Sequence, residues 1–156
     1  MNTTEFLAIS GAIVPDRSAI IFEDRRITYQ ELAERVSRLT NALADMGVGA
    51  GDRLAIMQVN CTQGIETYFA AAQLDAIYVP INFRAKTEEL GQMLRIAEPS
   101  YLFIGERYLS MVPTSGEGAL ALERQIVLDS EAIAGRLGYE ELLAAAMPDQ
   151  LHFPEA

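Results

Sequence analysis

The chain has 156 residues, 50% of them hydrophobic, and a formal net charge of −10 at pH 7. This length suffices for one hydrophobic core, so we expect a single domain, or one part of a domain, over 1–156. The acidic balance and the lack of a Lys- and Arg-rich run argue against nucleic acid and anionic membrane surfaces as partners.

The beginning of the chain, MNTTEFLAIS, has no positively charged side chain and no long apolar run. We therefore expect neither a signal peptide nor a transmembrane segment. Cys61 is the only cysteine, which excludes an internal disulfide and fits a reducing compartment. Together these features predict a cytoplasmic protein.

The first predicted elements are short. Residues up to Pro15 predict an N-terminal helix that packs on the body of the protein. Two runs of strand-forming residues, 19–22 and 26–28, then flank a charged turn and predict a β-hairpin.

A long amphipathic helix is predicted after Thr28. Apolar residues recur at spacings of three and four and form one stripe, namely Tyr29, Leu32, Ala33, Val36, Leu39, Leu43 and Met46. Arg35 and Arg38 fall on the opposite, polar face. There they stand four residues after Glu31 and Glu34, in surface pairs that add only ~0.3 kcal/mol each.

Both ends of this helix are signalled in the sequence. Thr28 and Glu31 have the spacing of a capping box, in which each side chain accepts a hydrogen bond from the other residue's backbone N–H. Gly47 predicts the stop, because glycine readily adopts the left-handed conformation just past a last turn. Val48 is then expected to touch Leu43.

A strand–helix–strand unit follows. Residues 54–57 predict a strand, Asn60 a helix cap, and 76–79 a second strand. The helix between them is expected to bury the stripe Ile65, Tyr68, Phe69 and Ala72 and to end near Leu74. Strands joined by a helix are parallel, and parallel strands are covered on both faces, so both strands should be buried.

The same alternation continues to the end of the chain. Thr87 predicts the cap of a helix that buries Leu90, Met93, Leu94 and Ala97, and Pro99 ends it. The further elements are a strand at 101–104, a short helix at 106–112, a loop at 113–118, a strand at 126–128 and a helix at 139–146. This order predicts an α/β fold, a parallel sheet with helices on both faces.

Three stretches carry a resemblance to a known family. They are Thr-Tyr-x-Glu-Leu at 28–32, Gly-x-x-x-Gly-Asp-Arg at 47–53 and Val-Pro-Ile-Asn-Phe-Arg at 79–84. Over about 16–106 the chain resembles the N-terminal part of the AMP-forming acyl-CoA synthetases, members of the adenylate-forming superfamily. The third stretch is similar to the fatty-acid and medium-chain branch. The implied fold is the first subdomain of the adenylate-forming N-terminal domain.

The resemblance implies an activity for a longer protein. Such enzymes use ATP, Mg²⁺ and CoA to convert a carboxylic acid to an acyl-CoA through an acyl-adenylate. The family's phosphate loop, which ends in Pro-Lys-Gly, is expected just after Ala156, and the catalytic lysine further on. We therefore assign 1–156 to one partial domain with no catalytic, cofactor-binding or metal-binding residue of its own.

Asp75 departs from the family pattern, which usually has glycine there. We expect the turn to survive, because aspartate tolerates the left-handed conformation better than most side chains.

Two glycine-containing stretches could be mistaken for phosphate loops. Gly47, Gly49 and Gly51 lie after a helix and before a strand, the reverse of the order in a dinucleotide-binding loop, and so predict a tight connection. Thr114, Ser115 and Gly116 resemble the opening of the family's loop. They continue into Glu117, which would repel a triphosphate, and no Pro-Lys-Gly follows, so we expect a surface loop.

The remaining candidates are single side chains. Cys61 at a helix start could be a nucleophile, but a small buried apolar role is favoured. His152 is interpreted as a linker residue, since no second metal-type ligand stands near it. Arg84, Lys86 and Arg107 are interpreted as solvated surface charges, although the resemblance makes a contact between Arg107 and the nucleotide end of CoA conceivable.

Three hypotheses about function follow. The first is the scaffold part of a medium- or long-chain fatty-acid–CoA ligase, whose main partner is the remainder of the same enzyme. The second is a stand-alone, non-catalytic module for docking or for forming a homodimer. The third is part of another adenylating enzyme, of the aryl-acid or peptide-synthetase type. Under the first hypothesis we expect an uncovered apolar surface, and hence self-association of the short chain.

Overall fold

The computed structural model describes residues 3–148, and a five-stranded parallel sheet forms its centre. The strands in chain order are β3 (Arg53–Met57), β4 (Ile77–Pro80), β5 (Tyr101–Ile104), β6 (Gln125–Val127) and β7 (Leu137–Gly138). Their spatial order is β4-β3-β5-β6-β7, and every neighbouring pair is parallel. The chain therefore adds β4 on one side of β3 and all later strands on the other.

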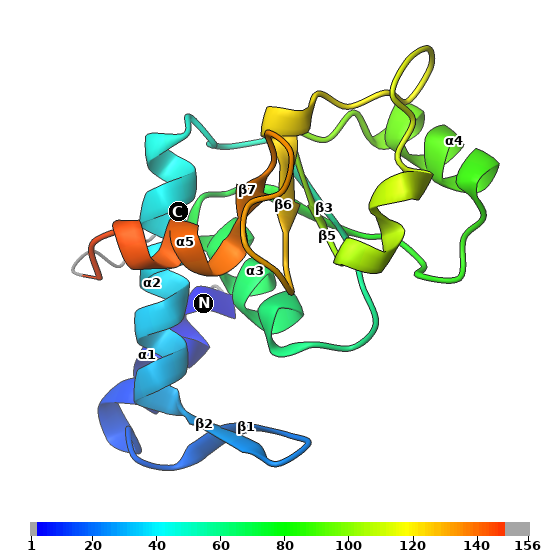
Figure 1. Cartoon of the computed structure of the whole chain (residues 1–156). Helices are drawn as coiled ribbons and strands as arrows, with labels where there is room; N and C mark the ends of the chain where they lie inside the picture. Colours follow the sequence, from blue (N-terminus) through cyan, green and yellow to red (C-terminus); the bar gives the residue numbers. More distant parts are fainter. Residues whose placement is uncertain (1–2, 149–156) are drawn as a thin grey trace.

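Helices cover both faces of this sheet. The helices among the described residues are α1 (Thr3–Ile13), which packs on α2 and α3, α2 (Tyr29–Asp45), α3 (Thr62–Gln73), α4 (Thr87–Ala97), α5 (Tyr139–Ala145) and the 3₁₀ helices η1 (Glu106–Met111) and η2 (Leu122–Arg124). In Figure 1, α2, α3 and α5 lie on one side of the strands, and α4 and η1 lie on the other. The predicted α/β class, with a parallel sheet and helices on both faces, is confirmed.

Two hydrophobic cores result from the alternation of side chains along each strand. Leu54 and Ile56 of β3 point to a core shared with α2, α3 and α5. Ala55 and Met57 point to a second core shared with α4 and η1. Alternate residues of β3 thus pack into the same core. Fully burying one large apolar side chain stabilises the fold by about 1.5–3 kcal/mol.

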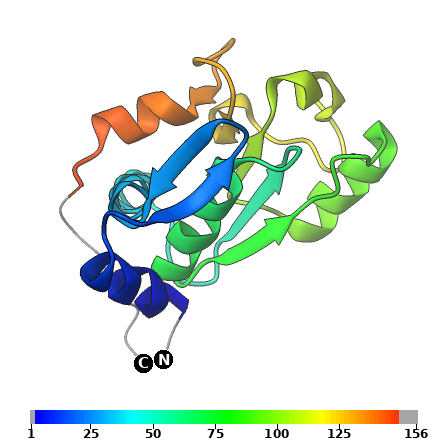
Figure 2. The same ribbon diagram turned by 90° about the horizontal axis from the view of Figure 1, so that it is seen from below.

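The hairpin, β1 (Ser18–Phe22) and β2 (Arg25–Thr28), stands apart from the main sheet. Figures 1 and 2 show that it lies beneath α3, on the side where the carboxyl ends of β3 and β4 emerge. A small third core joins it to α1 and α2 through Leu7, Ile27 and Val36. The hairpin is therefore anchored by its packing on α1 and α2, and its turn at 23–24 lies away from this third core.

The predicted ends of α2 are confirmed. The Glu31 N–H donates to Thr28 Oγ1 at 3.1 Å, and the Thr28 N–H donates to Glu31 Oε2 at 2.7 Å. At the other end Gly47 has φ +88°, and the Val48 N–H donates to the Leu43 carbonyl at 2.9 Å. This pairing closes the helix in the way expected for a glycine stop.

The two other predicted caps are wrong by one residue. Cys61, not Asn60, is the N-cap of α3, and Lys86, not Thr87, is the N-cap of α4. Cap preference is a weak signal beside packing, which here draws the first residue of α3 into the buried region. Glu89 secures the start of α4 by accepting a 2.7 Å hydrogen bond from the Lys86 N–H.

The stripe predicted for α3 is also wrong. Ile65 and Tyr68 are each 40% exposed, whereas Glu66 and Gln73 are buried. The reason is that α3 packs on α2 through polar side chains that find partners there, for example Thr40 Oγ1 with Gln73 Oε1 at 2.7 Å. Pairing removes the cost of burying them.

Strand β4 was expected to be buried, and it is not. It is the edge strand of the sheet, with Ile77 48% exposed and Pro80 exposed. Its position follows from β5 pairing on the opposite side of β3, and an edge is where a strand tolerates proline.

The structure also tests the predictions about one turn and the short elements. Asp75 has φ +55°, which confirms the left-handed turn without glycine. The predicted short helix at 106–112 is the 3₁₀ helix η1, and the expected strands at 101–104 and 126–128 correspond to β5 and β6. The short strand β7 was not predicted, because so brief a stretch carries no periodic pattern.

Candidate functional site

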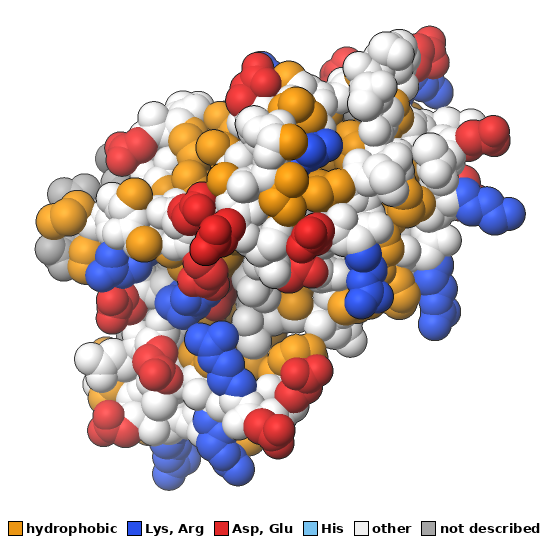
Figure 3. All heavy atoms as spheres, in the orientation of Figure 1, with side chains coloured by type: hydrophobic (Ala, Val, Ile, Leu, Met, Phe, Trp, Pro, Cys, Tyr) orange, Lys and Arg blue, Asp and Glu red, His pale blue; other side chains and the backbone are white. Residues whose placement is uncertain are grey.

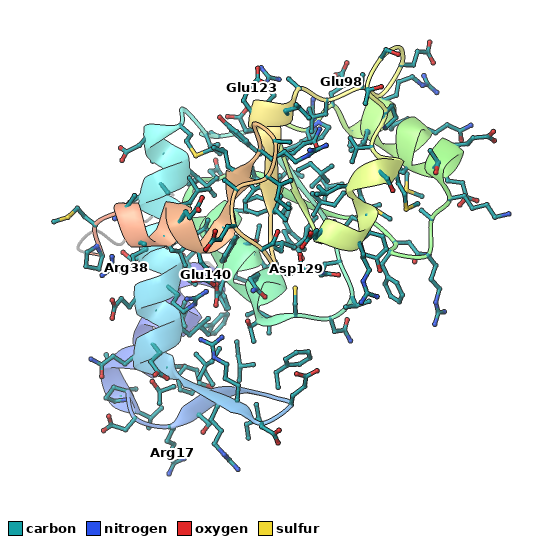
Figure 4. The ribbon with its side chains drawn as sticks, viewed as in Figure 1. Arg17, Arg38, Glu98, Glu123, Asp129 and Glu140 are labelled. Atoms are coloured by element: carbon teal, nitrogen blue, oxygen red, sulfur yellow. The ribbon has the colours of Figure 1, made fainter. Side chains whose placement is uncertain are left out.

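Polar groups gather at the carboxyl edge of the sheet. Gln58 follows β3, Glu106 follows β5, and Asp129 lies just past β6. Because strands are added in opposite directions on the two sides of β3, the edge between β3 and β5 is a topological switch point, where open α/β sheets bind ligands. Figure 4 shows Asp129 at this edge, near the start of η1.

Hydrogen bonds join these three strand ends. Asp129 Oδ1 accepts the Glu106 N–H at 2.7 Å, and Asp129 Oδ2 accepts from Gln58 Nε2 at 3.1 Å. A Cβ on Gly105 would lie 2.3 Å from Gln58 Nε2, so glycine is required for Gln58 to cross here. Sequence reasoning missed this cluster, although a polar residue within two positions of the end of each buried strand was a usable signal.

A mainly apolar pocket of about 660 Å³ lies beside this edge, between the hairpin, α3 and the ends of β3 and β4. Its walls include Ile21 of β1, Ile65 and Tyr68 of α3, Tyr78 of β4 and Phe83. Among residues 3–148, no Asp, Glu, Lys or Arg lines it. We name it the hairpin pocket, and its chemistry suits an uncharged apolar group.

A buried ionic network lies on the other side of α3. Arg35 forms a bidentate pair with the fully buried Glu66, with Nε–Oε1 2.7 Å and Nη2–Oε2 3.1 Å. The Tyr139 hydroxyl donates to Glu66 Oε2 at 2.6 Å, and Glu140 holds Arg35 from the solvent side at 2.7 Å. The network therefore ties together α2, α3 and α5, and Figure 4 shows Glu140 beside these helices.

This environment shifts two pKa values. Burial, reinforced by the neighbouring Glu66 charge, raises the pKa of Tyr139 well above its ordinary 10.0. Burial opposes the charge of Arg35, but hydrogen bonds to Glu140 and Glu66 outweigh it and raise the pKa of Arg35. Arg35 therefore stays charged and Tyr139 stays neutral, as a fully paired buried network requires.

A pH-dependent stability follows from Tyr139. Above about pH 10 an unfolded tyrosine releases its proton while the folded Tyr139 keeps it, so the folded state binds more protons and stability falls by up to about 1.4 kcal/mol per pH unit. Tyr139→Phe should cost about 1–3 kcal/mol near pH 7 through the lost hydrogen bond, and this cost should shrink above pH 10. Urea unfolding from pH 7 to 11 measures it; a cost independent of pH would contradict the assignment.

The glycines at 47, 49 and 51 form the connection from α2 to β3. The Gly49 N–H donates to Asp52 Oδ2 at 2.8 Å, and the Gly51 N–H donates to the Asp75 carbonyl at 2.9 Å. The bond from Gly49, with a second from Ser100, lowers the pKa of Asp52. These two amides are thus used inside the protein and do not point to a phosphate.

The loop with Thr114, Ser115 and Gly116 is exposed at the surface. Glu117 pairs with Arg95 of α4 at 3.3 Å, so a carboxylate stands where a phosphate loop needs a cation. A Cβ on Gly118, which has φ +80°, would lie 2.2 Å from a backbone oxygen of α4. The loop is therefore held down on α4.

The single candidates lie apart from one another. Cys61 is half-buried in the wall of the hairpin pocket, and burial raises the pKa of its thiol, which disfavours the thiolate. His152 lies outside the described residues. Arg84, Lys86 and Arg107 are exposed near the carboxyl ends of β4 and β5, and no ion pair joins them to a described acidic residue.

Within residues 3–148, a Mg²⁺–ATP site would need metal ligands and a cation beside the phosphates. No cluster of three or more His, Cys, Asp or Glu in this range could hold a metal ion. Lys86 is the only lysine of the sequence, and it does not lie in the Ser115 loop. On the face in Figure 3, Lys and Arg side chains are interspersed with Asp and Glu. Within the same range, no helix is both long and apolar enough to span a membrane.

The comparisons with known proteins agree with this topology. The family model described as "AMP-binding enzyme" matches residues 9–150. The chain belongs to the AMP-binding enzyme family. An indoleacetate–CoA ligase of Aromatoleum aromaticum is 32% identical over 143 residues, covering 92% of this chain and 28% of the relative. A long-chain-fatty-acid–CoA ligase of Thermus thermophilus is 30% identical over 159 residues, covering 99% and 29%.

Solved structures of CoA ligases share the fold. The anthranilate–CoA ligase AuaEII, in complex with anthranoyl-AMP, superposes with a TM-score of 0.90 at 20% identity, over 100% of this chain and 30% of that one. A putative long-chain-fatty-acid–CoA ligase from Rhodopseudomonas palustris gives 0.85 at 27% identity, over 100% and 39%. The resemblance to the adenylate-forming superfamily is confirmed, and the chain spans less than a third of the length of the curated relatives named above.

Proposed function

We propose that this chain is the first part of the AMP-binding domain of a CoA ligase, an enzyme that activates a carboxylic acid with ATP and transfers it to CoA. The observation that carries the proposal is that relatives at least 30% identical over nearly the whole chain are CoA ligases. In such a reaction a carboxylate oxygen attacks the α-phosphorus of ATP and pyrophosphate leaves. The CoA thiol then attacks the acyl carbon, and AMP leaves.

The role of 1–156 in this enzyme is structural. We assign it no catalytic, cofactor-binding or metal-binding residue, and we place the phosphate loop after Ala156. The carboxyl edge with Gln58 and Asp129 would then face the remainder of the same enzyme, its main partner, where ATP, Mg²⁺ and CoA bind. The enzyme is proposed to be cytoplasmic.

The acid class has two candidates. The Val-Pro-Ile-Asn-Phe-Arg stretch at 79–84 favours a medium- or long-chain fatty acid, as does the Thermus relative. Aryl acids are favoured by the indoleacetate–CoA ligase and by a feruloyl-CoA synthase of Amycolatopsis, 36% identical over 106 residues. We retain the fatty acid as the first proposal and the aryl acid as the second.

The nucleotides that follow the Ala156 codon test the proposal directly. We expect an open frame that encodes a Ser/Thr- and Gly-rich string ending in Pro-Lys-Gly. The protein expressed from that frame should release AMP when given an acid, ATP and CoA, and a panel of fatty and aryl acids identifies the substrate. A stop codon at this point would instead favour a stand-alone docking module or homodimer.

A further inference from the structure

We propose that the hairpin pocket is the docking site for an uncharged, apolar segment of the remaining part of the same enzyme. This inference rests on the proposed function, because it requires the chain to be joined to a larger enzyme. It goes further by naming the surface and the chemistry of what covers it.

The first observation is the exposure of large apolar side chains around one hollow. Ile21 is 62% exposed, and Ile65 and Tyr68 are each 40% exposed, although they come from two separate elements. All three line the hairpin pocket. Scattered exposed apolar residues are ordinary, but several that converge on one cavity indicate a binding surface.

The second observation is the orientation of α3. The buried side of this helix carries the small residues Ala70 and Ala71 together with paired polar groups, Glu66 with Arg35 and Gln73 with Thr40. Its larger apolar side chains Ile65 and Tyr68 line the pocket instead. In this orientation the apolar surface of α3 that lines the pocket stays exposed to water unless another segment covers it.

The third observation is that one wall of the pocket is already ordered. The Tyr68 ring meets the rings of Phe69 and Tyr78 edge-on, with centroids 5.4 Å and 5.7 Å away. Rigid aromatic walls bind an apolar partner at a low entropic cost. The occupant should therefore be an apolar side-chain cluster rather than a charged group.

The occupant we favour is the enzyme's own remaining chain. Relatives matched over 99% and 92% of this chain are covered over only 29% and 28% of their own length. A segment joined covalently docks at a high effective concentration, so it outcompetes a second copy or a free ligand. The described residues that line the pocket carry no charge, which fits a buried contact, since a charge there would have to be desolvated.

Cys61 provides the test, because this single cysteine lies in the pocket wall. Its alkylation by iodoacetamide is followed by mass spectrometry in the 156-residue chain and in the protein expressed to its natural end. We expect Cys61 to react at least about tenfold more slowly in the longer protein, because a covered thiol reacts only through local opening. Both proteins should react alike in urea. Equal rates under native conditions would overturn the proposal.

A matched pair of variants distinguishes docking from indirect protection. In the longer protein, Tyr68→Asp should restore fast alkylation of Cys61, because it places a charge in the pocket. Met93→Asp on α4, a residue of similar exposure outside the pocket, should not. If Tyr68→Asp does not fold, Ile65→Asp replaces it. Slow alkylation in both pocket variants, or fast alkylation in the control, would contradict docking at this site.

Other occupants give different results. In the longer protein, protection that rises with protein concentration would identify a second copy, and in the short chain, protection by decanoate or indoleacetate would identify a small-molecule site; either overturns the proposal. Acid-dependent pyrophosphate exchange is measured on the same longer protein. Exchange without protection of Cys61 would refute the docking proposal and leave the ligase function supported. Protection without exchange would support docking and refute the ligase function.

Discussion

Replacing Glu66 by Gln is expected to lower the free energy of unfolding by about 3 kcal/mol. Glu66 is fully buried and Arg35 is only 19% exposed, so the substitution removes the charge that balances a largely buried guanidinium. Removing one partner of a buried ion pair typically costs about 3–5 kcal/mol. The lower end applies here because Glu140 still pairs with Arg35. Urea denaturation of the 156-residue chain measures the loss.

Glu34→Gln is the matched control. Glu34 pairs with Arg38 at 3.1 Å on the surface of the same helix, and such exposed pairs contribute at most about 1 kcal/mol. The double variant Arg35→Met with Glu66→Leu should cost less than Glu66→Gln alone, because it leaves no unpaired buried charge. Equal effects of Glu66→Gln and Glu34→Gln would show that the buried network does not stabilise the fold.

The second large effect concerns nucleotide chemistry. The 156-residue chain is expected to bind Mg–ATP no more tightly than about millimolar, which corresponds to roughly −4 kcal/mol. It should show no exchange of labelled pyrophosphate into ATP with any acid. The protein expressed to its natural end should bind Mg–ATP more tightly than this and should catalyse the exchange. The physical reason is that adenylation depends on preorganised donors and a metal around the phosphates. Residues 3–148 hold no cluster of three or more His, Cys, Asp or Glu that could bind a metal ion.

Calorimetry and the exchange assay are run on the two proteins side by side. Circular dichroism of the short chain should show a folded protein, so that a negative result is not caused by unfolding. Micromolar binding of ATP by the short chain would place the nucleotide site within 1–156, and our assignment of no site residues there would be wrong.

The sequence by itself determined the features that depend on neighbouring residues. The capping box of Thr28 with Glu31 and the glycine stop at Gly47 are local, since each is formed by groups within a few positions. The strand–helix alternation likewise predicted the parallel sheet, because a crossover helix constrains the direction of the next strand. The left-handed turn at Asp75 was expected from the glycine that the family usually has there, and aspartate tolerates this conformation.

Only the tertiary structure decided which faces are buried and which groups meet. Arg35 belongs to the polar face of α2 by spacing and was expected to pair with Glu31, yet its partners, Glu66 and Glu140, come from α3 and α5. In the same way, Asp129 meets Gln58 although 71 positions separate them. Burial depends on the element that packs opposite, and periodicity describes one element at a time. The hydrophobic pattern of α3 therefore could not show that Glu66 and Gln73 face α2 while Ile65 and Tyr68 face the hairpin pocket.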